Sequence, residues 1–462
     1  MSAKSPSAVA WLRRAAGQEG PIYAAIVRAL EVAIQAGELQ PGDRLPAQRT
    51  VAAQLGVDLT TVTRAYSAAR TLGLLEGEVG RGTFVRSRSE EDEAGLVDLS
   101  MNLPPPPEGL SLGALLRETI DGVLQRTDPA VLMAYHPGFG TLGQRRAGAE
   151  WLAPVLGERA PQSVLVSPGA QAALAAAFSS LCRPGDLVVS EPLTYPGFKA
   201  ITAQLGLRTS ACPVDGAGVV PEALLEICRR ERPAAVYLTP TMQNPTARTM
   251  PSSRRREVAR ILAEAGVWLV EDDPYSRLLE APPPAIASLL PARSIYIGTL
   301  AKTLSPGLRI AYLACPDPDL ADQTAAALRA IALMPAPLMA AVATTWIREG
   351  RAETVLKAVR AEARARRALA AAALPTAEGS PESLHVWLPL AADASAEALR
   401  RAAHGRGLAL VTEAAFAVAP SPPPGVRVSL GGPGRRAVLA AALRSLADLL
   451  AAQPPPGGRA VV

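Results

Sequence analysis

The sequence predicts a multidomain protein: a small, mostly helical unit at the N-terminus, then a large α/β domain that ends in a smaller α+β lobe. Two observations predict this division. Residues 19–86 contain three helical patterns and then a hairpin pattern, whereas from Val97 onward short apolar strands alternate with helices. After Pro335 the pattern changes to long Ala- and Arg-rich helices with a few strands between them. The expected domains are residues 19–86, a linker at 87–98, a large domain at 99–335 and a lobe at 336–462.

Composition excludes some classes of protein and leaves others open. The chain has 462 residues, 49% of them apolar, which is enough for several hydrophobic cores. There is no charge-free apolar run of about 18 residues and no secretion-signal pattern, so we expect a cytoplasmic protein without a membrane span. The four cysteines lie far apart without metal-ligand spacing, which favours reduced thiols and no metal site. A net charge of +5 permits nucleic-acid binding without requiring it.

The N-terminal unit shows the pattern of a helix-turn-helix. An amphipathic helix is expected from Pro21 to Gly37, and a second helix from about Ala47 to Leu55. After a glycine turn, Asp58 can cap a third helix, whose outer face carries hydroxyl and arginine side chains. Residues 74–85 then predict a two-stranded hairpin, or wing, with Arg81 at its tip. This order of elements is typical of DNA-binding units.

Three runs of residues carry a resemblance to a known family. They are G-x-L-x-x-G-x-x-L-P-x-x-R at 37–49, G-V-x-x-x-T-V-x-x-A-Y at 56–66 and G-x-G-T-F-V at 80–85. The unit resembles the winged helix-turn-helix of the GntR transcription factors, which implies double-stranded operator DNA as a partner. The residues that this resemblance places against DNA are Arg49, Thr61, Arg64, Arg81 and Gly82.

One residue departs from the family pattern. Leu59 stands directly after the cap of the third helix, where the family usually has an arginine, so one expected DNA contact is in doubt. The alternative, a small helical dimerisation module, leaves the Arg-Gly-Thr hairpin unexplained.

Polar side chains follow three successive apolar strands of the large domain. Asn244 follows the strand at 235–240, Asp272 and Tyr275 follow the strand at 267–270, and Lys302 follows the strand at 295–300. Open α/β sheets bind ligands at these strand ends. The chain has 47 basic residues but only four lysines, so a lysine here is informative: its amine can attack an aldehyde, whereas a guanidinium stays charged. The alternative is an ordinary surface lysine.

These motifs together resemble the pyridoxal-phosphate (PLP) enzymes of the aspartate aminotransferase fold, fold type I. The shared patterns are N-P-T, D-x-x-Y and K-x-x-x-x-G-x-R. The resemblance implies that Lys302 forms the Schiff base with PLP, that Asp272 pairs with the ring nitrogen and that Arg427 binds a substrate carboxylate. The other cofactor-binding residues that it implies are Ala170, Gln171, Tyr195, Asn244, Tyr275, Thr299 and Arg309, with Tyr135 supplied by the partner chain.

Arg427 lies alone in an apolar strand, 426–430. Burying an unpaired guanidinium costs about 3 kcal/mol or more, so we expect an anionic ligand or an acidic neighbour beside it.

Both halves on one chain resemble the MocR subfamily of GntR regulators. This implies a homodimeric, PLP-binding transcriptional regulator whose effector is PLP itself or an amine or amino acid held as an external aldimine. An aminotransferase with an accessory DNA-binding domain stays open, since the cofactor set is complete. A DNA-binding protein with an inactive scaffold would predict loss of Lys302, Asp272 or Arg309, and none of the three is lost.

Overall fold

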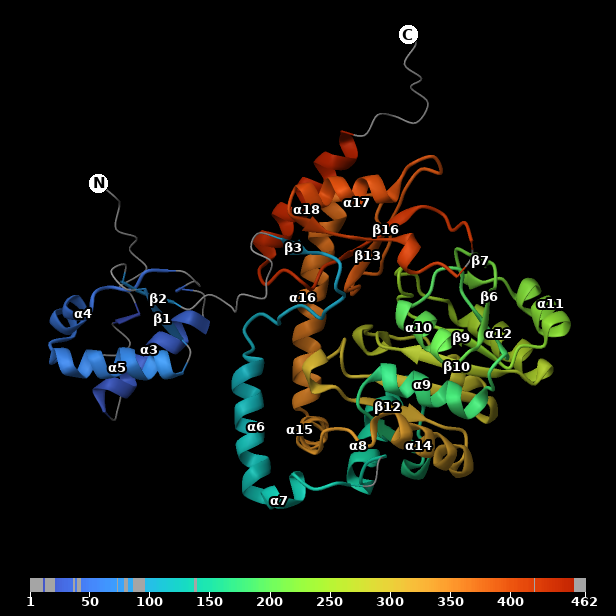
Figure 1. Cartoon of the computed structure of the whole chain (residues 1–462), viewed down its shortest axis with the longest axis horizontal. Coiled ribbons are helices and arrows are strands. Elements are labelled where there is room, and N and C mark those ends of the chain that lie inside the picture. Colours follow the sequence, from blue (N-terminus) through green and yellow to red (C-terminus); the bar gives the residue numbers. More distant parts are fainter. Residues whose placement is uncertain are drawn as a thin grey trace, which may run out of the picture. The chain divides into compact units, whose positions relative to one another are not determined.

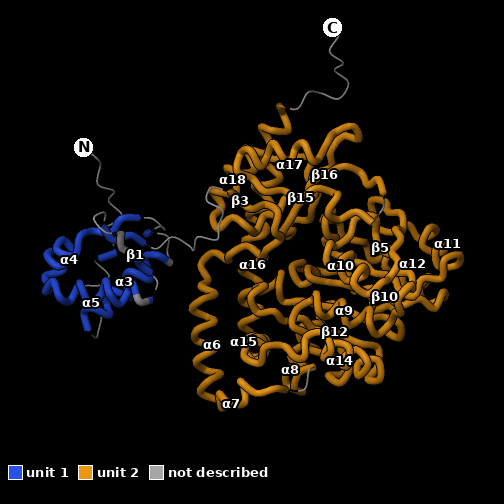
Figure 2. The backbone as a smooth tube through the Cα atoms, in the orientation of Figure 1, with its two compact units in different colours: residues 1–95 blue, residues 96–462 orange. Residues whose placement is uncertain are grey.

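The computed structural model describes residues 11–12, 21–35, 38–39, 43–72, 74–78, 82–85, 96–136, 139–418 and 420–452. The chain divides into two compact units, residues 1–95 and 96–462 (Figure 2). Most of the expected linker, up to Gly95, lies outside the described residues, as does Arg81. Each unit has buried hydrophobic clusters of its own.

Unit 1 is a three-helix unit with a hairpin. Its helices are α3 (Ile22–Gln35), α4 (Gln48–Leu55) and α5 (Leu59–Thr71), and its strands are the antiparallel pair β1 (Leu75–Glu78) and β2 (Gly82–Val85). The Asp58 carboxylate accepts a hydrogen bond from the Thr60 amide, which caps α5 as the sequence predicts. Apolar residues from all three helices and the hairpin share one core, which includes Leu30, Val51, Val62, Tyr66 and Val85.

A seven-stranded sheet forms the centre of unit 2 (Figure 1). Only β12 runs antiparallel to its neighbours. Its strands are mostly short apolar runs buried on both faces, as expected for a mainly parallel sheet between helices. In spatial order they are β4 (Val164–Ser167), β12 (Ala311–Ala314), β11 (Ser294–Thr299), β10 (Trp268–Asp273), β9 (Ala235–Leu238), β5 (Leu187–Ser190) and β6 (Arg208–Ala211).

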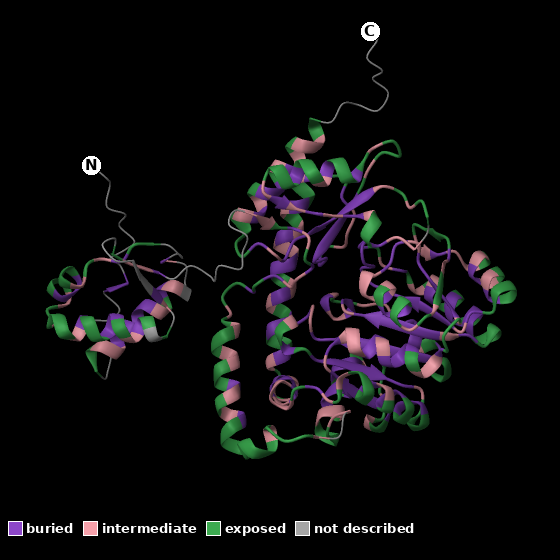
Figure 3. Ribbon diagram, viewed as in Figure 1, coloured by how far each residue is buried: buried purple, intermediate pink, exposed green. Residues whose placement is uncertain are grey.

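Helices cover both faces of this sheet, and alternate residues of β11 show it. Ile295 and Ile297 pack in the cluster that contains Phe178 of α9, whereas Tyr296 packs in the cluster that contains Trp151 of α8. Figure 3 shows the strands buried and the outer helix faces exposed. The helices of this part are α6 (Leu112–Arg126), α7 (Pro129–Leu132), α8 (Leu142–Leu156), α9 (Ala170–Leu181), α10 (Pro196–Gln204), α11 (Pro221–Glu231), α12 (Ser252–Ala265), α13 (Ile286–Leu289), α14 (Pro318–Ala332) and α15 (Pro337–Arg348).

The C-terminal lobe is a small α+β layer at one end of unit 2, drawn in orange and red in Figure 1. The first strand of the unit, β3, pairs with β14 of this lobe, so the segment around Leu99 is part of the lobe's core. The helices of the lobe are α16 (Arg351–Ala373), α17 (Ala396–Gly405) and α18 (Arg436–Ala451). Its strands are the antiparallel set β13 (His385–Pro389), β16 (Gly425–Ser429) and β15 (Val411–Thr412) and the parallel pair β14 (Leu408–Ala409) and β3 (Val97–Asp98). A separate hairpin, β7 (Val214–Asp215) and β8 (Gly218–Val219), belongs to the large lobe.

Several apolar runs of the sequence form strands whose bounds differ from those of the run. The apolar run that begins at Leu308 becomes a strand only at Ala311, because residues 306–308 form a 3-10 turn and Arg309 has a φ of 51°. The strand expected at 267–270 continues to Asp273. The run at 408–412 is divided between two sheets.

Short 3-10 turns lie between the helices and strands at Pro161–Ser163, Ser276–Leu278, Pro291–Arg293, Pro306–Leu308 and Glu413–Ala415.

Among the described residues, no helix combines the length and the apolar character needed to cross a bilayer. The same residues contain no cluster of three or more His, Cys, Asp or Glu side chains suited to a metal ion.

Candidate functional site

A cavity of about 540 Å³ lies between the strand ends of the large sheet and the C-terminal lobe. Strands β9, β10 and β11 deliver their C-terminal residues to it, as the sequence pattern predicts for an open α/β sheet. The residues of unit 2 that were predicted to bind the cofactor or a substrate carboxylate all line this cavity, except Tyr135, which is 83% exposed. The lining set comprises Ala170, Gln171, Tyr195, Asn244, Asp272, Tyr275, Thr299, Lys302, Arg309 and Arg427.

Lys302 lies shortly after the end of β11, and its Nζ donates a hydrogen bond to the backbone oxygen of Asn102. The pKa of this amine is lowered to about 8, mainly by burial and also by the positive charges of Arg427 and Arg309, while Asp272 opposes this shift. A sizeable fraction of the amine is therefore neutral near pH 8, which is the form that can attack an aldehyde.

Asp272 is the second ionisable group in the cavity. Its Oδ2 accepts a hydrogen bond from the Tyr237 hydroxyl at 2.8 Å, while its buried Oδ1 has no hydrogen-bond partner among the described residues. Burial raises the pKa of this carboxyl group to about 7, against the lowering effects of Tyr237 and Lys302. A buried acceptor without a partner is costly, so Oδ1 is suited to a ligand that brings an N–H donor.

The part of the cavity lined by Gly169, Ala170 and Arg309 suits a phosphate. Helix α9 begins after Gly169 with no side-chain cap, so its first N–H groups are available to an anion. Gly169 has a φ of 98°, and a Cβ there would lie 2.8 Å from Nη2 of Arg309, which donates to the Pro168 oxygen at 3.4 Å. Thr299 lines the cavity beside this guanidinium.

Tyr195 and Gln171 form one wall of the cavity. The Tyr195 hydroxyl donates to Oε1 of Gln171 at 3.0 Å, and Nε2 of Gln171 donates to the Gly197 oxygen at 3.2 Å. These bonds fix the aromatic ring against the start of α10, where a flat cofactor ring could stack on it.

The hydrogen-bond partners of Arg427 are neutral oxygens, and the acidic group that acts on its charge is Asp98, without a direct bond; the sequence led us to expect an anionic ligand or an acidic neighbour. Its Nη1 donates to Oδ1 of Asn244 at 2.7 Å and its Nη2 to the Ser100 oxygen, while the buried Nε has no hydrogen-bond partner among the described residues. The guanidinium also lies 5.0 Å from the ring centroid of Phe416. Neutral partners leave the positive charge of Arg427 available to an anion.

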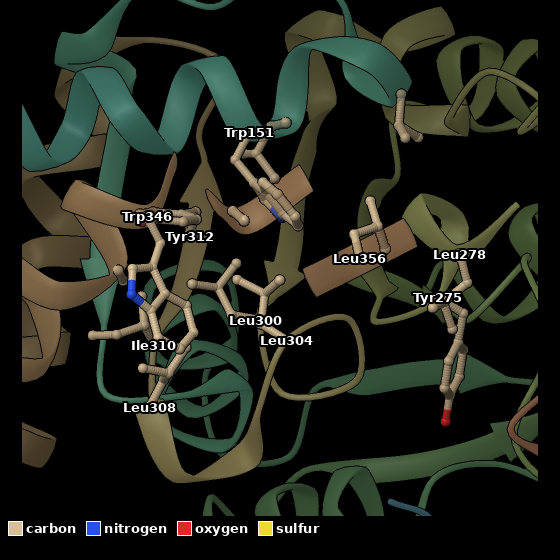
Figure 4. Close-up of a cluster of buried hydrophobic side chains, with 14 of the residues drawn as sticks. Trp151, Tyr275, Leu278, Leu300, Leu304, Leu308, Ile310, Tyr312, Trp346 and Leu356 are labelled. Atoms are coloured by element: carbon tan, nitrogen blue, oxygen red, sulfur yellow. The ribbon is translucent and has the colours of Figure 1, made fainter. Parts of the chain in front are cut away.

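Asn102 is a site residue that sequence reasoning did not single out. Its Nδ2 donates to the Tyr275 hydroxyl at 2.8 Å and lies 3.0 Å from Nδ1 of His385, whose Nε2 lies 3.2 Å from the Gln243 oxygen. Burial lowers the pKa of His385 to about 3, so the ring is neutral, with Nε2–H as donor and Nδ1 as acceptor. Figure 4 shows the Tyr275 hydroxyl pointing away from the hydrophobic cluster that holds its ring.

The segment that carries Asn102 is fixed to the C-terminal lobe. Leu99 accepts a hydrogen bond from the Ser429 amide at 2.8 Å and donates one to the Ala409 oxygen at 3.1 Å. The segment passes so close to Gly431 that a Cβ atom added to this glycine would lie 1.8 Å from the Leu103 backbone oxygen. The C-terminal lobe thus contributes both Asn102 and Arg427 to a cavity whose lysine belongs to the large sheet.

The described DNA-binding candidates lie in unit 1. Arg49 is exposed on α4, Arg64 is exposed on α5 with its guanidinium 4.1 Å from the centroid of the Tyr23 ring, and Thr61 is half-buried. Gly82 is exposed at the start of β2. Arg81 lies outside the described residues.

Two further arginines of unit 1 position the hairpin. Nη2 of Arg70, on α5, donates to the Thr83 hydroxyl at 3.0 Å. The backbone of Arg44 forms an antiparallel β-bridge with that of Phe84, and the Leu45 amide donates a hydrogen bond to the Thr83 backbone oxygen at 2.9 Å. The loop before α4 therefore extends the hairpin and fixes it to the helices, a contact that local patterns could not reveal.

Comparisons with known proteins agree with both units. The chain matches the family models "Aminotransferase class I and II" over residues 94–446 and "Bacterial regulatory proteins, gntR family" over residues 22–85. It is 30% identical to the HTH-type transcriptional regulator YdeF of Bacillus subtilis, across 90% of this chain and 91% of that protein. It is also 30% identical to the probable rhizopine catabolism regulatory protein MocR of Rhizobium meliloti, across 74% of each protein. The chain belongs to the MocR subfamily of GntR regulators.

A solved structure agrees with this membership. LysN, the α-aminoadipate aminotransferase of Thermus thermophilus, was solved with N-(5'-phosphopyridoxyl)-L-leucine; it has a TM-score of 0.72 and 27% identity, over 84% of this chain and 98% of that one. The protein is therefore a DNA-binding, PLP-linked transcriptional regulator with a winged helix-turn-helix and a fold type I domain.

The residues of the cavity fit PLP, on observations independent of the family. An unpaired buried acceptor on Asp272 suits a ring N–H, a lysine of lowered pKa suits an aldehyde, and an uncapped helix start beside Arg309 suits a phosphate.

Proposed function

We propose that this regulator binds an amine or amino acid in the cavity described above and that this binding changes its affinity for operator DNA. The observation that carries the proposal is the lysine amine of lowered pKa in a cavity whose walls come from two lobes. A ligand that contacts both lobes can favour one arrangement of them over another, which is the basis of a ligand-driven switch.

Each residue has a distinct proposed role in holding PLP. Lys302 would bind the aldehyde carbon covalently, Asp272 would accept from the ring nitrogen, and Tyr195 would stack on the ring. Asn244 and Tyr275 would bind the ring oxygen. The phosphate would be held by Ala170, Gln171, Thr299 and Arg309. When bound, PLP supplies an electrophilic carbon that exchanges its lysine for the amine of a ligand.

Arg427 would recognise a ligand carboxylate. A guanidinium matches a carboxylate with two parallel hydrogen bonds, and the neutral partners of Arg427 can be exchanged without leaving a buried negative charge unpaired. This favours amino acids over simple amines. PLP alone stays a second candidate effector, and the relative PdxR of Corynebacterium glutamicum, 30% identical over 61% of this chain, is described as a pyridoxine biosynthesis regulator.

We infer that the working form is a homodimer that shares its cavities. Tyr135 is 83% exposed and Met133 beside it 86%, which is unusual for large apolar side chains and suits a surface covered by a second copy. Tyr135 of the partner subunit would then reach the phosphate end of the cavity.

Aminotransferase turnover is the alternative function. The residues that line the cavity would also serve this alternative, together with Tyr135 of the partner subunit, and a 2-aminoadipate transaminase of Thermus thermophilus is 30% identical over 53% of this chain. Repeated transfer of an amino group to a keto acid, without any ligand effect on DNA binding, would favour this alternative.

Borohydride reduction tests the cofactor assignment directly. Reduction of the PLP-loaded protein followed by peptide mapping should leave the pyridoxyl group on Lys302, and Lys302→Ala should carry none. Lys199 is the matched control, because its Nζ donates to the Ala415 oxygen at 3.2 Å and it lies outside the lining of the cavity. A label on Lys199 or Lys357 in place of Lys302 would contradict the assignment.

A further inference from the structure

A second cavity, of about 400 Å³, lies in unit 2 next to the first. Neither PLP nor the proposed effector uses it. Its walls come from both lobes and are mainly apolar, with Pro, Leu, Val and Met side chains and one indole, that of Trp387. Such a concave, mostly apolar space with a few polar groups is typical of small-molecule sites.

One buried carboxyl group in this lining has no counter-charge. Glu191 is 6% exposed and accepts a hydrogen bond from Nε2 of Gln243 at 3.3 Å. The described residues place no cation within ion-pair distance of it, and burial raises its pKa to about 8. Burial thus favours the neutral acid, and a ligand that brings a positive charge beside Glu191 would stabilise its ionised form.

The other charged groups of the cavity are already paired. Arg248 holds Glu378 with two hydrogen bonds, of 2.7 and 2.9 Å. Asp215 is held by Arg254 with bonds of 2.9 and 3.1 Å. Glu191 is therefore the acidic group of the lining that has no cationic partner among the described residues, and a cationic ligand could supply one.

We propose that this second cavity binds a small organic cation, with its charge at Glu191 and its apolar body against Trp387 and Met250. The apolar lining would remove the body of the ligand from water, and the indole would add a favourable cation–aromatic contact. The expected ligand class is an aromatic or branched aliphatic amine.

The two cavities share a wall, which gives the second site a means of influencing the first. Thr239 lines both, and Leu193 and Trp387 of the second cavity pack with Phe416 of the first. Gln243 donates to Glu191, and its own backbone oxygen is the partner of His385, which contacts Asn102. A ligand at Glu191 therefore acts on the hydrogen-bond chain that ends at Lys302.

Benzyltrimethylammonium is a suitable probe, because a quaternary ammonium has no N–H and cannot replace the lysine on PLP. Calorimetric titration of the PLP-loaded, full-length protein should show it binding about tenfold or more tightly than the neutral N,N-dimethylbenzamide. Glu191→Gln should remove that preference, since it keeps the shape of the side chain without its charge. Glu264→Gln, on the exposed face of α12, is the matched control and should change nothing.

A second variant keeps the test decisive if Glu191→Gln does not fold. Leu390→Trp enlarges a half-buried side chain of the lining and should abolish binding of both probes. Binding of the cation should also shift the visible absorbance of bound PLP. Three results would overturn the proposed site: equal affinity for the two probes in the wild type, unchanged cation affinity in folded Glu191→Gln, or full binding in Leu390→Trp. Cation binding without an absorbance shift would overturn the coupling of this site to Lys302.

Discussion

Arg427 on β16 donates a hydrogen bond to Asn244 after β9 at 2.7 Å, so the two side chains proposed for the effector carboxylate and the PLP ring oxygen are bonded to each other. The bond joins the C-terminal lobe to the large sheet. A carboxylate ligand would compete with Asn244 for the guanidinium, and ligand binding would therefore change how the two lobes are connected.

Arg427→Lys should weaken binding of amino acids selectively. Lysine keeps the charge but lacks the two-pronged guanidinium, so we expect a loss of about 1.5–3 kcal/mol for phenylalanine and little change for phenethylamine. Absorbance titration of the PLP-loaded protein with both compounds measures this. Arg406→Lys, at an exposed position of the same lobe, is the control. Equal losses for the two compounds would show that Arg427 does not bind the carboxylate.

The rate of PLP capture should depend on pH through Lys302. The pKa of this amine, about 8, lies below its ordinary value, so the neutral form predominates above pH 8 and the rate should level off there. Below pH 8 the rate should fall about tenfold per unit, as protonation removes the nucleophile.

Asp272→Asn supplies the matched variant for this pH profile. Because the Asp272 carboxylate raises the pKa of the lysine, its removal should move the midpoint to lower pH. Stopped-flow absorbance on the apoprotein gives both profiles. A midpoint near the ordinary value for lysine, about 10.4, would contradict the environment described for Lys302.

Asn102→Ala should destabilise unit 2. The substitution leaves the Tyr275 hydroxyl and Nδ1 of His385 without the donor they now share, at a cost of about 1–3 kcal/mol. Denaturant unfolding of the full chain measures the loss. Ser395→Ala, which removes the cap of the peripheral helix α17, is a control whose loss should leave PLP absorbance unchanged, whereas Asn102→Ala should shift it.

Arg49→Ala and Arg64→Ala should weaken operator binding. For each phosphate contact removed, the slope of log affinity against log salt should flatten by about one unit, whereas loss of a base contact should cost about 1–3 kcal/mol at one operator position. Arg229→Ala makes the same change in net charge on exposed α11 of unit 2 and should leave the slope unchanged. An unaltered slope in both unit 1 variants would contradict a DNA-contacting role for these arginines.

Local patterns predicted the members of the cavity better than their contacts. Lys302, Asp272 and Asn244 each follow an apolar strand, and the geometry of a parallel sheet is sufficient to expect them at one edge. Asn102 and His385 lie far apart in the sequence, so only the folded chain shows that they meet. The partners of Arg427 were missed for the same reason.

Strand limits were harder to predict where buried polar groups find partners from other elements. Asp273 stays within β10 because it pairs with Gly298 of the neighbouring strand β11, and the Tyr296 hydroxyl of that strand donates to its buried carboxylate. The sequence shows only a run of acidic residues after an apolar strand, a pattern that favours a strand ending earlier.

The central claim is that ligand in the PLP cavity and operator DNA influence each other. DNA affinity should be measured with and without PLP and a candidate amino acid, in wild type and in Lys302→Ala. The wild type should show a coupling of about 1–3 kcal/mol, with DNA changing ligand affinity by the same factor as ligand changes DNA affinity. Lys302→Ala should bind DNA as the ligand-free wild type does and lose the response. An equal DNA affinity in every state of the wild type would contradict the claim.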